Sequence, residues 1–133
     1  MPTISSFHWS DSYVGLAYPP GSSYCGFLAM KVSKEVFNHP VCLPQALAEG
    51  VLAGQRQVED LINSDIACRV ETPQDGSLVL MRYGPLWHIG IFCVYPTEPW
   101  VLHALANAGQ VVRHRLRDLG RFGYKIEGFY QWL

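Results

Sequence analysis

The periodicity of the sequence changes at Gly76, and this change limits the possible folds more than any other feature. Before Gly76, apolar residues recur at the spacing of amphipathic helices. After it, short runs of β-branched and aromatic residues are separated by turn residues, which is typical of strands. Helices followed by strands indicate an α+β fold, with N-terminal helices packed on a C-terminal antiparallel β-sheet. No repeat or linker interrupts residues 1–133, so we expect a single domain.

The first half of the chain is expected to supply two helical regions. One helix should run from just after the serines at 22–23, which can cap it, to about Asn38. Its core-facing stripe recurs every fourth residue and consists of Leu28, Val32 and Val36. A second region, 45–62, follows Pro44 and contains two glycines, so it forms either one bent helix or two short ones. The chain before the first helix and residues 63–75 are expected to be irregular.

The second half of the chain is expected to supply the sheet. Strands are predicted at 77–83, 87–95, 100–105, 109–116 and 124–133. A short helical turn or loop at 117–123 separates the last two of them. The connections are too short for parallel crossovers, so neighbouring strands should be antiparallel.

The composition narrows the range of partners. The chain has 133 residues, of which 49% are hydrophobic, enough for one buried core. Charged residues make up only 16%, which predicts that a partner covers part of the surface. A net charge of -1 offers no basis for capturing nucleic acid or an anionic membrane. The sequence predicts no signal peptide and no membrane insertion, so synthesis in a cytoplasm is expected.

Cys25 lies where the first helix is expected to begin, and this position changes the chemistry of a cysteine. Unpaired backbone N–H groups and the positive end of the helix dipole lower the pKa of a thiol. The same N–H groups can hold an oxyanion, so Cys25 is a candidate nucleophile. The other cysteines form no CxxC pair and are expected to be reduced, buried and inert; they are Cys42, Cys68 and Cys93.

Two histidines, His88 and His103, occupy neighbouring predicted strands. Antiparallel pairing would place their rings side by side, and the small Gly90 would leave room for them. His88 could then take the proton of Cys25 while His103 orients the ring of His88. Simple packing of both rings is the alternative, and metal binding is disfavoured because no third ligand has a suitable spacing. The remaining histidines, expected on the surface, are His8, His39 and His114.

Several segments resemble the NlpC-type cysteine peptidases, papain-like enzymes of bacterial cell walls. Those enzymes carry an Asp-Cys-x-Gly motif opening a helix, an "HVGIY" strand and an "HA" that ends the following strand. The counterparts in this chain are "YCGF" at Tyr24–Phe27, "HIGIF" at His88–Phe92 and "HA" at His103–Ala104. The segment "YVGLAY" and the ending "IEGFYQWL" are similar to short tail-associated members found in bacteriophages, the relatives of the lambda tail assembly peptidase.

The resemblance implies a papain-like fold and hydrolysis of peptide amides in peptidoglycan stems, often between D-γ-glutamyl and a diamino acid. It makes Cys25 the nucleophile, His88 the general base and His103 the orienting residue. Tyr18 and Tyr24 would contact substrate or the oxyanion, with Tyr24 standing where the family has Asp. No cofactor or metal is implied. The implied location is the phage tail of the virion, with other tail proteins as partners, after synthesis in the host cytoplasm.

Two other functions stay open beside the peptidase. A catalytically inactive structural tail protein that retains the peptidase fold would account for the altered segment Tyr24–Phe27 and the low charge. An acyltransferase of the related permuted families is disfavoured, because there the histidine precedes the cysteine, whereas here Cys25 precedes His88. For either tail-associated function, the aromatic ending "GFYQWL" could dock on other tail proteins or could close the sheet of the domain itself.

Overall fold

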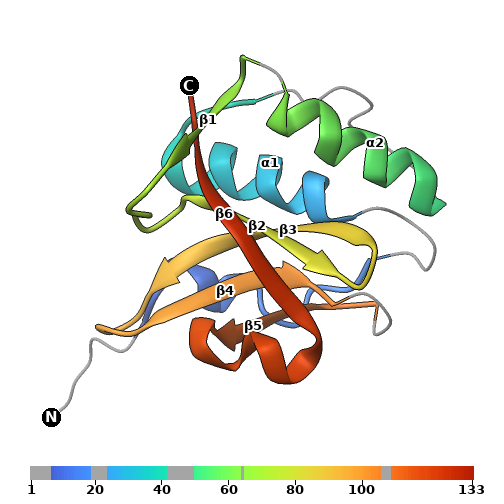
Figure 1. Cartoon of the computed structure of the whole chain (residues 1–133). Helices are drawn as coiled ribbons and strands as arrows, with labels where there is room; N and C mark the ends of the chain where they lie inside the picture. The colour runs from blue at the N-terminus through green and yellow to red at the C-terminus, as the bar shows by residue number, and fades with distance from the viewer. Residues whose placement is uncertain (1–6, 19–23, 42–49, 64, 106–108) are drawn as a thin grey trace, which may run out of the picture.

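The computed structural model consists of one sheet with helices packed against it (Figure 1). It describes residues 7–18, 24–41, 50–63, 65–105 and 109–133, apart from the side chains at 24, 50–54 and 57. The fold is α+β, with helices and an antiparallel sheet of six strands. The change of periodicity at Gly76 predicted this class.

Two α-helices cover one face of the sheet (Figure 1). They are α1 (Tyr24–Phe37) and α2 (Gly50–Ile62). The predicted stripe of α1 faces the core and consists of Leu28, Val32 and Val36. Asn38 follows α1 with a φ of 52°, the left-handed conformation in which many helices end. α2 is one continuous helix, and the predicted start of that region at 45–49 lies outside the described residues.

The sheet is antiparallel throughout. Its strands are β1 (Ala67–Val70), β2 (Leu78–Tyr83), β3 (Leu86–Val94), β4 (Pro99–Ala104), β5 (Val111–Arg115) and β6 (Tyr124–Trp132). Their order across the sheet is β1-β6-β2-β3-β4-β5. β2 to β5 follow one another as neighbours, whereas β6 returns across the sheet to pair with β2 and β1 (Figure 1).

The two faces of the sheet bury separate apolar layers. Strand residues 78, 80, 89, 91 and 102 point to one face and pack against α1 and α2. Their neighbours at 79, 81, 92 and 101 point to the other face and pack around Leu119 of the short 3₁₀ helix η2 (Leu116–Phe122). This alternation follows from the two-residue period of a strand. Among the described residues, no helix is both long and apolar enough to cross a membrane.

Two short elements were not predicted. The prediction of irregular chain at 63–75 was wrong over Ala67–Val70, which forms β1 and pairs with the end of β6. The segment has no clear alternation of apolar residues, so only its pairing with a distant strand makes it a strand. The prediction of irregular chain before the first helix was wrong over Trp9–Ser12, which forms the 3₁₀ helix η1.

The aromatic C-terminus closes the sheet. Phe129 packs on the layer around η2, whereas Tyr130 and Trp132 pack on the layer beneath the helices. All three are only partly exposed. The backbone N–H of Leu133 also donates to the carbonyl of Ile66, at 2.9 Å. Of the two predictions for this segment, closing the domain's own sheet agrees with the structure, and an exposed aromatic docking patch does not.

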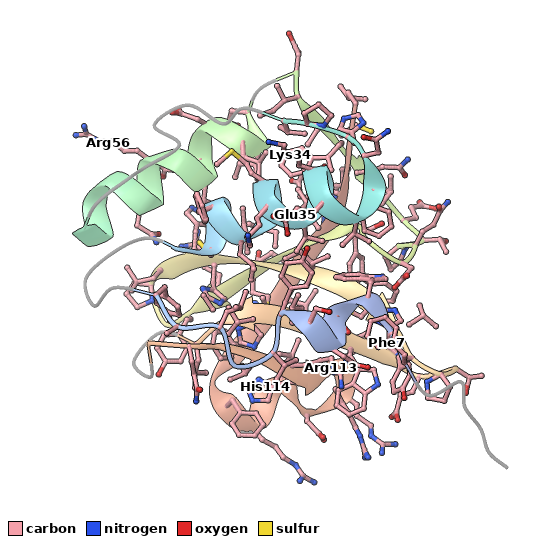
Figure 2. The ribbon with its side chains drawn as sticks, turned by 180° about the vertical axis from the view of Figure 1, so that it is seen from behind. Phe7, Lys34, Glu35, Arg56, Arg113 and His114 are labelled. Atoms are coloured by element: carbon pink, nitrogen blue, oxygen red, sulfur yellow. The ribbon has the colours of Figure 1, made fainter. Side chains whose placement is uncertain are left out.

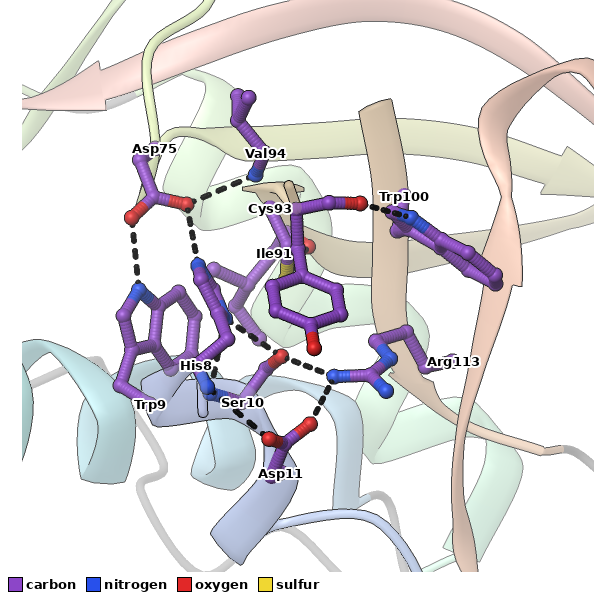
Figure 3. A network of polar contacts seen from close by, with 11 residues as sticks. His8, Trp9, Ser10, Asp11, Asp75, Ile91, Cys93, Val94, Trp100 and Arg113 are labelled. Carbon is purple, nitrogen blue, oxygen red and sulfur yellow. Dashed lines mark hydrogen bonds and ion pairs between the residues drawn. The ribbon is translucent and has the colours of Figure 1, made fainter. Parts of the chain in front are cut away.

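A polar network ties the N-terminal segment to the sheet (Figure 3). Ser10 is completely buried at its centre. The Nη1 of Arg113, on β5, donates to Oγ of Ser10 at 2.7 Å and to Oδ1 of Asp11 at 2.6 Å. Trp9 Nε1 donates to Oδ2 of Asp75, in the turn before β2, at 2.8 Å. Charge-assisted bonds of this kind hold η1 against both β5 and that turn.

Replacing Gly90 by alanine is expected to lower the free energy of unfolding by about 1–3 kcal/mol, because the added methyl overpacks the sheet. A Cβ there would lie 2.4 Å from Cγ1 of Val101 and 3.1 Å from the carbonyl oxygen of Leu102. Gly120→Ala is the matched control, since a Cβ at Gly120 meets nothing within 4 Å. Urea denaturation of the two variants measures the difference, and an equal effect at both positions would contradict the packing argument.

Candidate active site

Three adjacent strands each place one histidine on the face of the sheet that lies away from α1 and α2. His88 is on β3, His103 on β4 and His114 on β5. The register of β4 against its two neighbours makes His103 a diagonal neighbour of both other histidines. Diagonal positions are within reach of large rings, so the sheet itself brings the three imidazoles into line.

The three rings form a continuous chain of hydrogen bonds, which we call the histidine chain. His88 Nε2 lies 2.9 Å from His103 Nδ1. His103 Nε2 lies 3.0 Å from His114 Nδ1. Tyr124, at the start of β6, covers the first two rings with centroid distances of 5.1 Å and 4.9 Å. Each inner imidazole therefore has its orientation set by a neighbour on another strand.

Burial keeps the inner two histidines neutral. His103 is completely buried and His88 is 8% exposed. Burial alone lowers the pKa of His88 from its ordinary 6.5 to about 4. The pKa of His103 is lowered further, first by burial and then by the nearness of His88 and His114. At neutral pH these rings carry no charge, so they act as hydrogen-bond donors and acceptors rather than as cations.

His114 lies at the outer end of the histidine chain, and the expectation that it is a plain surface residue was wrong. It is only partly exposed, and its ring stacks on Phe122 of η2 with centroids 4.1 Å apart and planes 11° apart. Figure 2 shows it on the far side of the sheet from the helices. Burial lowers the pKa of His114, and the nearby Asp118 raises it by a smaller amount. The alternation of residues along the predicted strand 109–116 was the signal that could have found it.

Cys25 is the second residue of α1, and its thiol accepts a backbone hydrogen bond from Ile89 on β3, the strand that carries His88. Backbone hydrogen bonds from Ile89, Gly26 and its own amide lower the pKa of the thiol, but burial raises it by more. The expectation of a net lowered pKa was therefore wrong, because even the partial burial of Cys25 outweighs its backbone hydrogen bonds. No hydrogen bond joins Cys25 to His88 among the described residues; the two are connected through Ile89, the residue next to His88.

Of the two tyrosines singled out from the sequence, the structure describes the side chain of Tyr18 but not that of Tyr24. The hydroxyl of Tyr18 donates to the carbonyl oxygen of Leu105, just past the end of β4. Burial raises the pKa of Tyr18, and the electrostatic influence of Tyr124 and Cys25 raises it further. Tyr24 begins α1, and its side chain lies outside the described residues.

Gln55 of α2 holds the backbone immediately before His88, a role not anticipated from the sequence. Its Nε2 donates to the carbonyl of Trp87 at 2.9 Å, and its Oε1 accepts from the N–H of Trp87 at 2.6 Å. The side-chain amide thus occupies the position that a neighbouring strand would take beyond the end of β4. Together with Cys25, which accepts a bond from Ile89, it satisfies backbone groups along the edge of β3 and fixes the strand that carries His88.

A second set of residues has the composition of a hydrolase triad but serves a structural purpose. His8 Nδ1 lies 2.7 Å from Oγ of Ser10, and His8 Nε2 lies 3.2 Å from Oδ1 of Asp75 (Figure 3). Ser10 is completely buried and also accepts a bond from Arg113, so its oxygen cannot reach a substrate. The side chain of His8 is 10% exposed, so the expectation that His8 lies on the surface was wrong.

The described residues contain no group of three or more His, Cys, Asp or Glu side chains arranged to hold a metal ion. The three histidines bond to one another in a line and do not converge on one point. The other described cysteines are Cys68 and Cys93. Cys93 is buried as expected, with its pKa raised by burial to about 12, whereas Cys68 is exposed on β1, which corrects the expectation for it. Cys42 lies outside the described residues.

Acidification from pH 7 to pH 5 is expected to destabilise the protein through the inner histidines. Both have folded-state pKa values below the ordinary 6.5, so the unfolded chain binds more protons below that value. The stability is complete above about pH 6.5 and is lost as pH falls towards 4, at up to about 1.4 kcal/mol per pH unit for each ring. Urea denaturation at several pH values across this range measures the free energy of unfolding. His39→Asn, outside the histidine chain, should keep the same pH dependence, and a free energy of unfolding that does not fall would contradict the assignment.

Alkylation near neutral pH is expected to label Cys68 before Cys25 and Cys93. The thiolate is the reactive form, and Cys68 is exposed whereas the other two have raised pKa values. Iodoacetamide labelling with peptide mapping should give a rate at Cys68 more than about tenfold higher than at Cys25 or Cys93. In denaturant the three rates should become similar. Preferential labelling of Cys25 in the native chain would show that its helix start is more open and more polarised than described.

Comparisons with protein-family models, with curated proteins and with solved structures each found no match for this chain. The resemblance to the NlpC-type peptidases therefore rests on the motifs of the sequence alone. The structural feature that bears on function is the histidine chain next to the N-terminus of α1.

Proposed function

We propose that the chain is a cysteine peptidase with a papain-like NlpC-type fold, which hydrolyses peptide amides of peptidoglycan stems as part of a phage tail. Cys25 is the nucleophile, His88 the general base and His103 the residue that orients the base. The observation that most directly supports these roles is the 2.9 Å contact between His88 Nε2 and His103 Nδ1. It occupies one ring nitrogen of His88 and leaves Nδ1 as the nitrogen that can take a proton from a nucleophile.

The position of Cys25 supports its assignment as the nucleophile. Its thiol is at the first turn of α1, where the backbone N–H groups of Gly26 and Ile89 both bond to the sulfur. Donors at a helix start can hold the oxyanion that forms when the thiolate attacks a carbonyl. Tyr18, whose pKa is raised in part by the nearby charge of Cys25, is the residue that contacts the substrate in this proposal.

The pKa values define how the proton must move. The pKa of the Cys25 thiol is raised and that of His88 is lowered to about 4, so the resting pair is a neutral thiol and a neutral imidazole. A preformed thiolate–imidazolium pair is disfavoured by burial. In this mechanism the proton passes from Sγ to Nδ1 of His88 as the sulfur attacks, and His88 later returns it to the leaving amine.

The second candidate function is a structural tail protein that retains the fold without activity. The raised pKa of Cys25 and the missing hydrogen bond between Cys25 and His88 in the described residues favour it. In that case the histidine chain serves as a buried polar contact between strands. The two functions differ in one consequence, because only the peptidase requires the sulfur of Cys25.

Incubation with purified peptidoglycan, followed by analysis of the released muropeptides, tests the peptidase. Cys25→Ala should reduce product release by at least about a thousandfold, and His88→Ala should do the same. Cys68→Ala is the matched control and should retain activity, because Cys68 lies on β1 and is exposed. If no version releases fragments, and Cys25→Ala chains support tail assembly as well as the unaltered chain, the structural function is correct.

A further inference from the structure

The two bonds of the histidine chain make the ring protons interdependent. A neutral imidazole carries one ring proton, and each bond needs one donor and one acceptor. With three neutral rings, only two arrangements satisfy both bonds. In the first, each ring is protonated on Nε2, and the Nδ1 of His88 is bare. In the second, each ring is protonated on Nδ1, so His88 has no free nitrogen with which to accept a proton.

Protonation of the outermost ring selects the second arrangement. A charged His114 carries protons on both nitrogens, so its Nδ1 must donate to Nε2 of His103. His103 then carries its own proton on Nδ1 and donates to Nε2 of His88. His88 consequently holds its proton on Nδ1. One proton is gained in total, one proton shifts within each bond, and both buried rings stay neutral while the charge resides on His114.

We propose that His114 is a positioning residue that controls the base: its protonation switches His88 from the arrangement with a bare Nδ1 to the arrangement with a protonated Nδ1. The positive charge stays at the partly exposed end of the histidine chain, where it costs less than in the interior. Acid therefore turns off His88 at a pH set by His114, without placing charge on His88 itself. The role of His88 as a base rests on the proposed function, whereas the proton switch along the histidine chain does not.

The groups around His114 favour a positive charge on His114 rather than on His88 or His103. Burial lowers the pKa of His114, Asp118 on η2 raises it by a smaller amount, and Phe122 stacks on the ring without adding charge. The neighbouring Arg113 and Arg115 alternate to the opposite face of β5, where they pair with Asp11 and Glu98. Among the residues that the structure describes, Tyr124 of β6 is the titratable group seen in contact with the two inner rings.

Nitrogen NMR of the full chain tests the proposal directly, because protonated and bare ring nitrogens have distinct shifts. Long-range proton–nitrogen spectra are recorded from pH 8 to pH 5 on the unaltered chain, on His114→Asn and on His39→Asn. In the unaltered chain and in His39→Asn, Nδ1 of His88 should gain a proton in the same step in which His114 titrates. In His114→Asn, the amide oxygen can still accept from His103 but cannot become a cation, so Nδ1 of His88 should stay bare over this range.

Asp118→Asn provides a second test that leaves the histidine chain intact. Loss of the carboxylate should move the proton switch at His88 to lower pH, by up to about one unit, together with the titration of His114. This variant decides the matter if His114→Asn does not fold. A His88 that keeps the same ring proton throughout the titration of the unaltered chain, or that titrates independently of His114 in Asp118→Asn, overturns the proposal.

Peptidoglycan hydrolysis separates failure of this inference from failure of the proposed function. If both are correct, the acid limb of the activity of His114→Asn moves to lower pH than in the unaltered chain. If Cys25→Ala has no effect on any hydrolysis, the peptidase is excluded, but the NMR result still decides the switch. If the chain is active and its acid limb is the same in His114→Asn, His114 does not control the base.

Discussion

The register of three antiparallel strands is the constraint on which the candidate site depends. β3, β4 and β5 each contribute one histidine, and only the observed pairing makes His103 a diagonal neighbour of His88 and His114. A shift of one residue in any pair would send one ring to the opposite face. Gly90 supports this register, because a larger residue there would collide with Val101 on the next strand. The packing of the sheet and the order of the imidazoles therefore have the same origin.

Burial sets the chemistry of the site in a direction that sequence motifs do not indicate. A cysteine at a helix start is expected to ionise readily, yet partial burial raises the pKa of Cys25. Burial likewise lowers the pKa of His88. Both changes favour neutral groups at rest, so a reaction at this site must move its proton during attack. The two hydrogen bonds between Gln55 and Trp87 hold the start of β3, the strand that carries His88.

Much of the fold could be predicted because its periodic elements are long and regular. The stripe of Leu28, Val32 and Val36 predicted α1, and the apolar run around His88 predicted β3. β1 could not be predicted, since four residues without alternation become a strand only by pairing with β6 at the end of the chain. The exposure of Cys68 follows from the same edge position. The partial burial of His114 and His8 likewise depends on segments that are distant in sequence.

By itself, the sequence determined the α+β class, the strand positions of His88 and His103, and the helix start that carries Cys25. These depend on local periodicity and on residue type, both of which act on the backbone over a few neighbouring residues. Only the tertiary structure decided that a third ring, His114, continues the histidine chain and that partial burial raises the pKa of Cys25. Those properties depend on desolvation and on contacts between strands, and both arise only when distant segments exclude water from the same space.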